Sequence, residues 1–241
     1  MILITGGSGV LGKELRKVFP DALAQAHHEL DITSKHQVKQ YLQTHKVDTI
    51  IHAAAITSVE KCDKDKNLAY NTNFIGTRNL VEAIKNTNIL FVLISTACVF
   101  DGTRGMYKEN DIPCPENYYG ITKLLAEEEV KRLHSFIIIR TNFAAREKWK
   151  YPKAFTDRYG TYLFADQVAL GIKDVLKENS YHGDIGIFHV TGNKKLSMFE
   201  LAKMTTPDVQ PMTMADYKGA RLTIDMTLET SRCLPYNIKD R

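Results

Sequence analysis

The chain has 241 residues, of which 44% are hydrophobic and 25% charged, and its formal net charge is +4. This length supports one sizeable core, or a core domain with a small additional one, in an ordinary globular protein. The charge is too small and too dispersed to indicate a nucleic-acid-binding protein, although it suits an anionic small substrate. No apolar run reaches the roughly 20 residues of a membrane-spanning helix. We therefore expect a cytoplasmic protein that does not associate with membranes.

Cysteine and histidine spacing gives no sign of a metal site. The four cysteines form no C-x-x-C pair and the eight histidines form no H-E-x-x-H pattern. We expect reduced thiols and no bound metal.

The chain opens on a strand, a glycine turn and a helix. Residues 2–5 are an apolar run typical of a buried parallel strand, and residues 10–18 have amphipathic helical spacing. Between and within them, Gly6, Gly9 and Gly12 have the spacing G-x-x-G-x-x-G. The first allows a tight exit from the strand, the second lets the backbone approach a pyrophosphate, and the third lets the helix pack closely on the sheet. This context predicts dinucleotide binding at the turn.

Strand-like and helix-like segments alternate along the following part of the chain. The expected strands are 22–26, 49–53, 89–95, 136–140 and 186–191. The expected helices are 34–44 with Ser34 and Gln37 as a capping box, 66–86, one from Tyr119 to about 133, 165–176, and a short one capped by Ser197 with Glu200. This alternation predicts an α/β fold with a doubly wound parallel sheet.

Two segments, about 142–164 and 191–241, lack a clear sheet pattern. We expect them to form a small cap over the strand ends, where ligands bind in such folds. The cofactor-binding domain would then consist of 1–141 and about 165–190, and the cap would bind the substrate.

Tyr119 and Lys123 are four residues apart on a predicted helix, so they share one face. Lowering the pKa of a phenol from about 10 by roughly 3 units requires about 4 kcal/mol of differential stabilisation of the phenolate. A nearby ammonium and an oxidised nicotinamide ring can supply it. The spacing is common by chance on surface helices, but the upstream glycine turn makes a nicotinamide-dependent enzyme the favoured interpretation.

Further motifs accompany the glycine turn in a fixed order. They are Glu29-Leu30-Asp31-Ile32-Thr33, His52-Ala53-Ala54-Ala55, Asn71-Thr72-Asn73-Phe74-Ile75-Gly76-Thr77, Ile94-Ser95-Thr96, Val99-Phe100-Asp101-Gly102, and Tyr118-Tyr119-Gly120-Ile121-Thr122-Lys123. Over most of its length the chain thereby resembles the extended short-chain dehydrogenases/reductases, and among them it looks most like the dTDP-4-dehydrorhamnose reductases.

The resemblance implies a catalytic set. Tyr119 would give a proton to the substrate oxygen as hydride reaches the carbonyl carbon. Lys123 would lower the pKa of the phenol and hold the nicotinamide ribose, and Thr96 would hydrogen-bond the same carbonyl. Taken alone, Thr96 could equally be a threonine that ends a strand.

The resemblance also implies a cofactor site. Asp31 and Ile32 match positions that meet the adenine, the alanines of 53–55 would line the cleft, and Asn73 would support the active-site geometry or be an ordinary polar helix residue. The full set of implied contacts is Gly6, Gly9, Val10, Leu11, Gly12, His27, Asp31, Ile32, Ala53, Ala54, Ala55, Asn73, Ser95, Tyr119, Lys123 and Asn142.

The choice of cofactor depends on the end of the second strand. A carboxylate there normally binds the adenosine ribose of NAD, but the chain has Gln25-Ala26-His27-His28 before the first acid, Glu29. This favours NADPH, with NADH as the alternative. His27 or His28 would contact the 2′-phosphate, unless both are idle surface histidines.

The substrate side departs from the pattern of the resembled reductases. Ala97-Cys98 stands where they have an Asp-Tyr pair that borders substrate and nicotinamide, and the stretch after Arg140 is shorter than theirs. Trp149, flanked by Lys148, Lys150 and Lys153, either stacks on a base or sugar near the diphosphate or packs in the cap. The implied substrate residues are Thr57, Thr96, Tyr119, Trp149 and Arg221, the last near the phosphates.

These features predict an NAD(P)H-dependent reductase of a nucleotide-linked 4-keto-6-deoxy sugar, acting in dTDP-rhamnose and polysaccharide biosynthesis. One alternative is an epimerase or dehydratase, although dehydratases add an acidic pair beside the catalytic hydroxyl, where this chain has Ala97-Cys98. Another is a non-catalytic cofactor-binding regulator. The nucleotide stays open, and so does a homodimer, which some members of the resembled family form.

Overall fold

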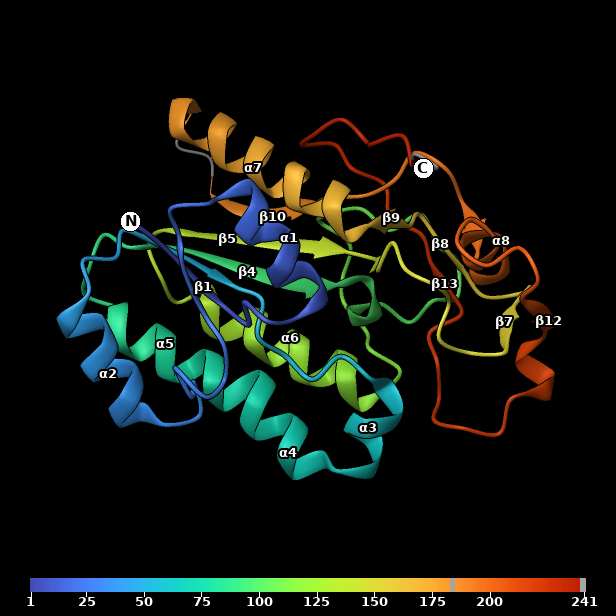
Figure 1. Cartoon of the computed structure of the whole chain (residues 1–241), viewed down its shortest axis with the longest axis horizontal. Coiled ribbons are helices and arrows are strands. Elements are labelled where there is room, and N and C mark those ends of the chain that lie inside the picture. The colour runs from blue at the N-terminus through green and yellow to red at the C-terminus, as the bar shows by residue number, and fades with distance from the viewer. Residues whose placement is uncertain (183–184, 239–241) are drawn as a thin grey trace.

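A six-stranded parallel sheet forms the centre of the computed structural model, which describes residues 1–182 and 185–238 (Figure 1). The strand order is β10-β5-β4-β3-β1-β2, and every neighbouring pair is parallel. The strands are β1 (Ile2–Thr5), β2 (Leu23–Gln25), β3 (Thr49–His52), β4 (Leu90–Thr96), β5 (Phe136–Thr141) and β10 (Gly186–His189). The predicted doubly wound parallel fold is confirmed.

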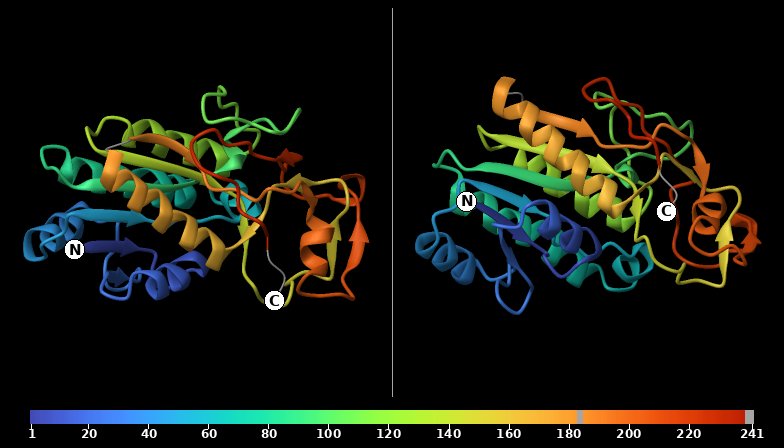
Figure 2. Two further views of the ribbon diagram at one scale, coloured as in Figure 1. Left: turned by 90° about the horizontal axis from the view of Figure 1, so that it is seen from above. Right: turned by 45° about the horizontal axis from the view of Figure 1, so that its top comes forward.

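Helices cover both faces of this sheet (Figures 1 and 2). On one face lie α1 (Val10–Val18) and α7 (Ala165–His182), and on the other lie α2 (Lys35–Thr44), α5 (Gly76–Ile84) and α6 (Tyr118–Val130). Successive strand side chains alternate between these two layers. Ile4 packs with the α1 and α7 side, whereas Leu3 packs with the α5 and α6 side.

The segment expected as one helix over 66–86 is divided. The structure has α4 (Lys66–Tyr70), a π-helical turn η1 (Asn71–Ile75) and then α5, with a separate α3 (Val59–Lys64) before them. The chain stays helical from 66 to 84 through the π turn, so the sequence pattern does not mark the change of helix type. Such turns are frequent at functional sites, and this one carries Asn73.

Two expected helix starts have different outcomes. Ser197 and Glu200 form the complete capping box of α8 (Met198–Lys203), as predicted. Ser34 caps α2 by accepting a hydrogen bond from Gln37 N. The Gln37 side chain, however, accepts from Asp31 N rather than from the Ser34 backbone, so the predicted box at Ser34 is wrong in its second half.

Short strands form in the two segments for which no sheet pattern was expected. They are β6 (Phe143–Ala144), β7 (Lys153–Phe155), β8 (Tyr159–Gly160), β9 (Leu163–Phe164), β11 (Leu196–Ser197), β12 (Gln210–Met212) and β13 (Asp225–Met226). They form separate small sheets, β11-β8-β13, β12-β7 and β6-β9. Runs of two or three residues are too short to show alternation, which explains the difference. With α8, these strands lie beyond the carboxyl ends of β4 and β5 (Figure 1).

The residues that the structure describes show the state of the cysteines, the lengths of the helices and the possible metal ligands. All four cysteines are free, with Cys62 and Cys98 buried. Over residues 1–182 and 185–238, no helix combines the length and apolarity needed to cross a membrane. In the same ranges, no three His, Cys, Asp or Glu side chains gather as a metal ion would require.

Candidate active site

Thr96, Tyr119 and Lys123 meet where β4 ends against the start of α6. Tyr119 is 8% exposed and Lys123 only 2%. Asn117 caps α6 by accepting from Gly120 N at 2.9 Å. A Cβ at Gly120 would lie 2.2 Å from the Cys98 carbonyl oxygen, so only glycine lets α6 come this close to the turn that follows Thr96. The close packing that Gly120 allows thus places the Tyr119 phenol beside Thr96 at the end of β4.

The protonation states of the pair follow from burial. Burial raises the pKa of Tyr119 above its usual value, and a hydrogen bond with Thr96 only partly opposes this shift. Burial also lowers the pKa of Lys123 to about 8, opposed by the charge of Glu127. Burial has the largest effect on the phenol in this structure, and the lowering expected from Lys123 together with an oxidised nicotinamide ring stays a prediction. The phenol is protonated at neutral pH, which is the form of an acid.

Glu127 continues the Tyr119 and Lys123 stripe by one more turn of α6. Its carboxylate is fully buried and accepts from the Ser95 hydroxyl, and from Arg140 Nε at 3.0 Å and Nη2 at 2.7 Å. Ser95 and Arg140 are register partners on β4 and β5. One carboxylate thus ties the catalytic helix to two central strands. The Ser95 hydroxyl, expected at the cofactor, is used within this network.

Asn73 joins the segment after β3 to the catalytic helix. Its side-chain oxygen accepts from Ile56 N at 2.7 Å, and its Nδ2 lies 3.0 Å from both the Ile56 carbonyl and the Thr122 hydroxyl. The residue is 1% exposed. Its amide is thus occupied by protein partners that hold the site in shape.

His52 connects three elements beneath the site. Its ring nitrogens lie 2.6 Å from Thr5 Oγ1 and 3.0 Å from Thr77 Oγ1. Burial, with a smaller effect of the Lys123 charge, lowers the pKa of His52 to about 3. The ring is therefore neutral and acts as a buried hydrogen-bonding bridge.

The glycine turn forms a close-packed cradle at the start of α1. Gly6 has φ +77°, and a Cβ there would lie 2.7 Å from Ala54 Cα. A Cβ at Gly12 would lie 2.1 Å from the Gly6 carbonyl oxygen, so its close approach is to the turn rather than to the sheet. Gly9 is exposed and is the N-cap of α1 without a side-chain cap. Such an open helix start suits a phosphate group.

The expected cofactor contacts next to the cradle differ in exposure. Val10 is 49% exposed at the helix start, whereas Leu11 is 4% exposed and packs in the core. Ala53, Ala54 and Ala55 are half-buried directly after β3. These alanines therefore leave part of their surface accessible beside the glycine turn.

The two residues expected at the adenine are largely occupied. The Asp31 carboxylate accepts from the Thr33 amide at 2.9 Å and from its hydroxyl at 2.7 Å. Ile32 is 4% exposed and packs against Gly76. Further along the site, the Asn142 amide donates to the Met226 carbonyl at 2.6 Å and so fastens β5 to β13.

The residues after β2 leave histidine side chains in solvent. His27 and His28 are exposed, and His27 Nδ1 lies 3.7 Å from the Asp31 carboxylate. Glu29, the first acid after the strand, folds back to accept from Ala26 N at 2.7 Å. No free carboxylate therefore stands directly at the end of β2 to repel a 2′-phosphate.

The predicted substrate residues are not gathered into one described cluster. Thr57 is exposed after β3. Arg221 is exposed and forms an ion pair with Glu116. Both lie outside helices and strands.

Trp149 is half-buried and packs in the cap, and its stacking on a base or sugar stays a prediction. It contacts the apolar cluster of Ala154, Ala202 and Val209, and its Nε1 donates to the Lys153 carbonyl at 3.3 Å. The flanking side chains of Lys148, Lys150 and Lys153 are exposed.

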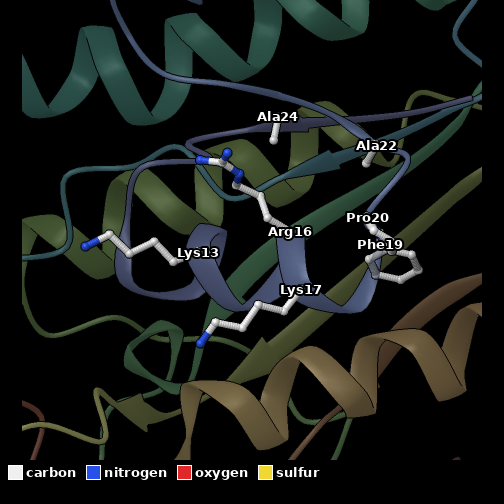
Figure 3. Close-up of a pocket in the computed structure, with 7 residues that line it drawn as sticks. All are labelled: Lys13, Arg16, Lys17, Phe19, Pro20, Ala22 and Ala24. Carbon is white, nitrogen blue, oxygen red and sulfur yellow. The ribbon is translucent and has the colours of Figure 1, made fainter.

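A basic hollow is lined by none of Thr96, Tyr119 and Lys123 (Figure 3). Its volume is about 470 Å³, and it is lined by Lys13, Arg16, Lys17, Phe19, Pro20, Ala22 and Ala24. The lining comes from α1 and the residues up to β2, and contains no acid or nucleophile. It has cations for attracting anions but no group for catalysis.

Sequence reasoning missed the Glu127 and Arg140 pair. Glu127 lies four residues after Lys123, which itself lies four after Tyr119, so helical spacing was an available signal. That Arg140 and Ser95 would meet this carboxylate depends on the register of β4 and β5, which the sequence pattern does not fix.

A protein family, a named relative and a solved structure each match more than half of this chain. The model of the RmlD substrate binding domain family matches residues 1–148. A dTDP-4-dehydrorhamnose reductase of Aggregatibacter actinomycetemcomitans is 32% identical, over 94% of this chain and 90% of that protein. The crystal structure of a dTDP-4-dehydrorhamnose reductase from Bacillus anthracis in complex with NADP superimposes with a TM-score of 0.86 at 29% identity, covering 95% of this chain and 89% of that one.

One of the similar proteins is named as a subunit of another enzyme and not as a reductase. The methionine adenosyltransferase 2 subunit beta of Xenopus laevis is 27% identical over 83% of this chain and 69% of that protein. The matched family model covers the glycine cradle and the whole Thr96, Tyr119 and Lys123 constellation. The chain therefore belongs to the RmlD substrate binding domain family.

Proposed function

We propose that the chain is an NADPH-dependent reductase of a nucleotide-linked 4-keto-6-deoxy sugar, of the dTDP-4-dehydrorhamnose reductase kind. The observation that carries this proposal is a buried, protonated Tyr119 beside Thr96 and Lys123. Two similar proteins are named dTDP-4-dehydrorhamnose reductases, and one of them binds NADP. The similar epimerase structures, such as one from Campylobacter jejuni at 20% identity, support the fold alone.

The residues present fit a dinucleotide. The exposed Gly9 and the α1 N-terminus without a side-chain cap would hold the pyrophosphate, and a side chain at Gly6 or Gly12 would close the cradle. His27 would meet the 2′-phosphate, which supports NADPH as the preferred cofactor and NADH as the weaker one. NADPH supplies the hydride when bound.

The chain itself supplies the proton and the positioning. The Tyr119 hydroxyl donates its proton to the C4 oxygen of the sugar, while the Thr96 hydroxyl hydrogen-bonds the same oxygen. The Lys123 ammonium stabilises the phenolate that remains and holds ribose hydroxyls, and water then returns the proton. Burial of these side chains keeps bulk water away from the step.

The division of labour between segments is part of the same proposal. Residues 1–141 and about 165–190 would bind the cofactor, and about 142–164 and 191–241 would bind the substrate. Arg221 would exchange its Glu116 partner for a substrate phosphate, and Thr57 would line the sugar site. A cytoplasmic location and a homodimer remain predictions.

A second candidate is a cofactor-binding regulatory subunit. It is favoured by the Ala97-Cys98 replacement beside Thr96 and by the likeness to a protein named as a subunit of methionine adenosyltransferase. The intact Thr96, Tyr119 and Lys123 constellation supports the reductase instead.

The test is NADPH consumption with 4-keto-6-deoxy sugars linked to dTDP, UDP or GDP. Wild type should consume NADPH with at least one of them, and Tyr119→Phe should not. Absence of consumption with all three, in a protein that binds NADPH, would contradict the reductase and favour the regulatory subunit.

A further inference from the structure

A buried cation lies beside the turn that follows Thr96. Arg158, directly before β8, is 8% exposed. Its Nε donates to the Thr223 carbonyl at 2.9 Å, and its two terminal nitrogens contact Met198 Sδ at 3.6 Å and Met226 Sδ at 3.4 Å. Across residues 1–182 and 185–238 it forms no ion pair. Thioether sulfurs are weak acceptors, so this charge is poorly compensated.

An unbonded phenol points to the same place. Tyr162 is 4% exposed, and its buried hydroxyl has no hydrogen-bond partner. Its Cζ, the carbon that carries the hydroxyl, would be 2.7 Å from a Cβ on Gly160. Gly160 pairs directly with Met226 between β8 and β13, and Met226 also receives Arg158. The buried hydroxyl and the guanidinium therefore converge around one methionine.

This location adjoins the reaction centre. Cys98 Sγ donates to the same Met226 sulfur at 3.4 Å, and Cys98 N donates to Thr96 Oγ1 at 3.1 Å. Tyr162 and Tyr119 belong to one apolar cluster with Cys98. Where the resembled reductases have an acid and a phenol, this chain thus brings a cation and a phenol from the cap.

The acid nearest along β13 is already in use. Asp225 pairs with Lys195 and accepts from the Thr227 amide and hydroxyl. Of the five N–H donors of a guanidinium, Arg158 uses three, all of them on neutral acceptors. A carboxylate or phosphate oxygen is the acceptor that would complete both this fork and the Tyr162 hydroxyl.

We propose that Arg158 and Tyr162 form an oxyanion subsite of the substrate pocket. The oxyanion is the diphosphate of the nucleotide sugar, because the 4-keto-6-deoxy sugar itself has no carboxylate. This ligand class rests on the proposed function, but the binding test below does not require turnover.

The test compares dissociation constants measured by calorimetry in the presence of NADP⁺. The ratio for UMP over UDP reports the second phosphate, and the ratio for UDP-glucose over UDP-glucuronate reports a carboxylate on the sugar. In Tyr162→Phe and Arg158→Met, the first ratio should fall about tenfold, as expected for loss of a charge-assisted hydrogen bond, and the second should not change. A fall of the second ratio alone would overturn the diphosphate assignment. Tyr236→Phe, a phenol bonded to Asp174 on the α7 side, should leave both ratios unchanged.

Thermal unfolding separates this role from packing. Tyr162→Phe removes an oxygen that has no partner in the free protein, so its Tm should not fall below that of wild type. The subsite would be overturned if Tyr162→Phe and Arg158→Met both kept the wild-type ratios of dissociation constants. A protein that shows the ratio change but reduces no sugar would refute the proposed function while the subsite stands.

Discussion

The central sheet and the cap differ in how their polar groups are satisfied. Under the sheet, the Glu127 carboxylate has three hydrogen-bond donors from Ser95 and Arg140 and is fully buried. In the cap, Arg158 is nearly as buried but contacts sulfur and one carbonyl, and the Tyr162 hydroxyl contacts no partner. Complete networks rigidify a structure, whereas incomplete ones mark where a ligand can bind. This difference agrees with the proposals that the sheet side holds Tyr119 as the acid and that the cap recognises the substrate.

The largest expected effect is at the acid itself. Tyr119→Phe should lower kcat about 10²- to 10⁴-fold, because proton donation is lost while the ring still packs. NADPH binding, measured by fluorescence titration, should stay within about twofold of wild type. Loss of binding together with activity would instead make Tyr119 a residue of the cofactor site alone.

Breaking the complete network of the sheet side should cost stability. Glu127→Gln leaves Arg140 buried without its counter-charge, which should lower the free energy of unfolding by about 3 kcal/mol. Denaturant unfolding measures this value. Glu128→Gln is the matched control on the same helix, because Glu128 is exposed and pairs with Lys131 at the surface, so it should change stability by less than about 1 kcal/mol. Equal losses in the two variants would contradict the described network.

Closing the glycine cradle should weaken the cofactor. A Cβ in Gly12→Ala would approach the Gly6 carbonyl oxygen, so the turn must open by displacing backbone. We expect a cost of about 1 to 3 kcal/mol, seen as weaker NADPH binding and a lower Tm. Unaltered affinity in this variant would show that the cradle does not hold the pyrophosphate.

The pH dependence of kcat tests the electrostatics of α6. Burial holds the pKa of Lys123 at about 8, so activity that needs the ammonium should decline as the pH rises through this value. Glu127 raises that pKa, and Glu127→Gln should therefore shift the alkaline limb to lower pH. The same depressed pKa means that the unfolded chain binds more protons between about pH 8 and the usual lysine range, so the contribution of Lys123 to stability rises with pH there. If the alkaline limb did not shift in Glu127→Gln, Glu127 would not influence the pKa that controls activity.

The smallest expected effect concerns cofactor preference. His27→Ala should raise the KM for NADPH a few-fold and leave the KM for NADH unchanged, because one exposed contact to a 2′-phosphate is worth little. His36→Ala, another exposed histidine on α2, serves as the control. A parallel change for both cofactors would assign His27 to the turn rather than to the phosphate.

The sequence alone predicts those features that depend on residues close together in the chain. Gly6, Gly9 and Gly12, and the pair of Tyr119 and Lys123, lie within one turn or one helix, so their spacing alone indicates their geometry. The strands of the main sheet were likewise visible as apolar runs. The predicted fold is confirmed, whereas the roles of the site residues remain predictions.

The remaining features depend on pairings between distant segments. Arg140 meets Glu127 through strand register, and Arg158 meets Met226 through strands of two residues that show no pattern. The burial that raises the pKa of Tyr119 is a property of the folded chain, so the spacing of Tyr119 and Lys123 could not show it. The contact of Trp149 with Ala202 and Val209 likewise joins distant segments, so the sequence could not show it.

The most direct test of the central claim is transfer of deuterium from NADPH labelled at C4 of the nicotinamide. With a 4-keto-6-deoxy nucleotide sugar, the product analysed by mass spectrometry and NMR should carry deuterium on C4 of the sugar, and Tyr119→Phe should yield almost none of it. Product formed without the label, or label lost to water, would contradict a reduction at that carbonyl.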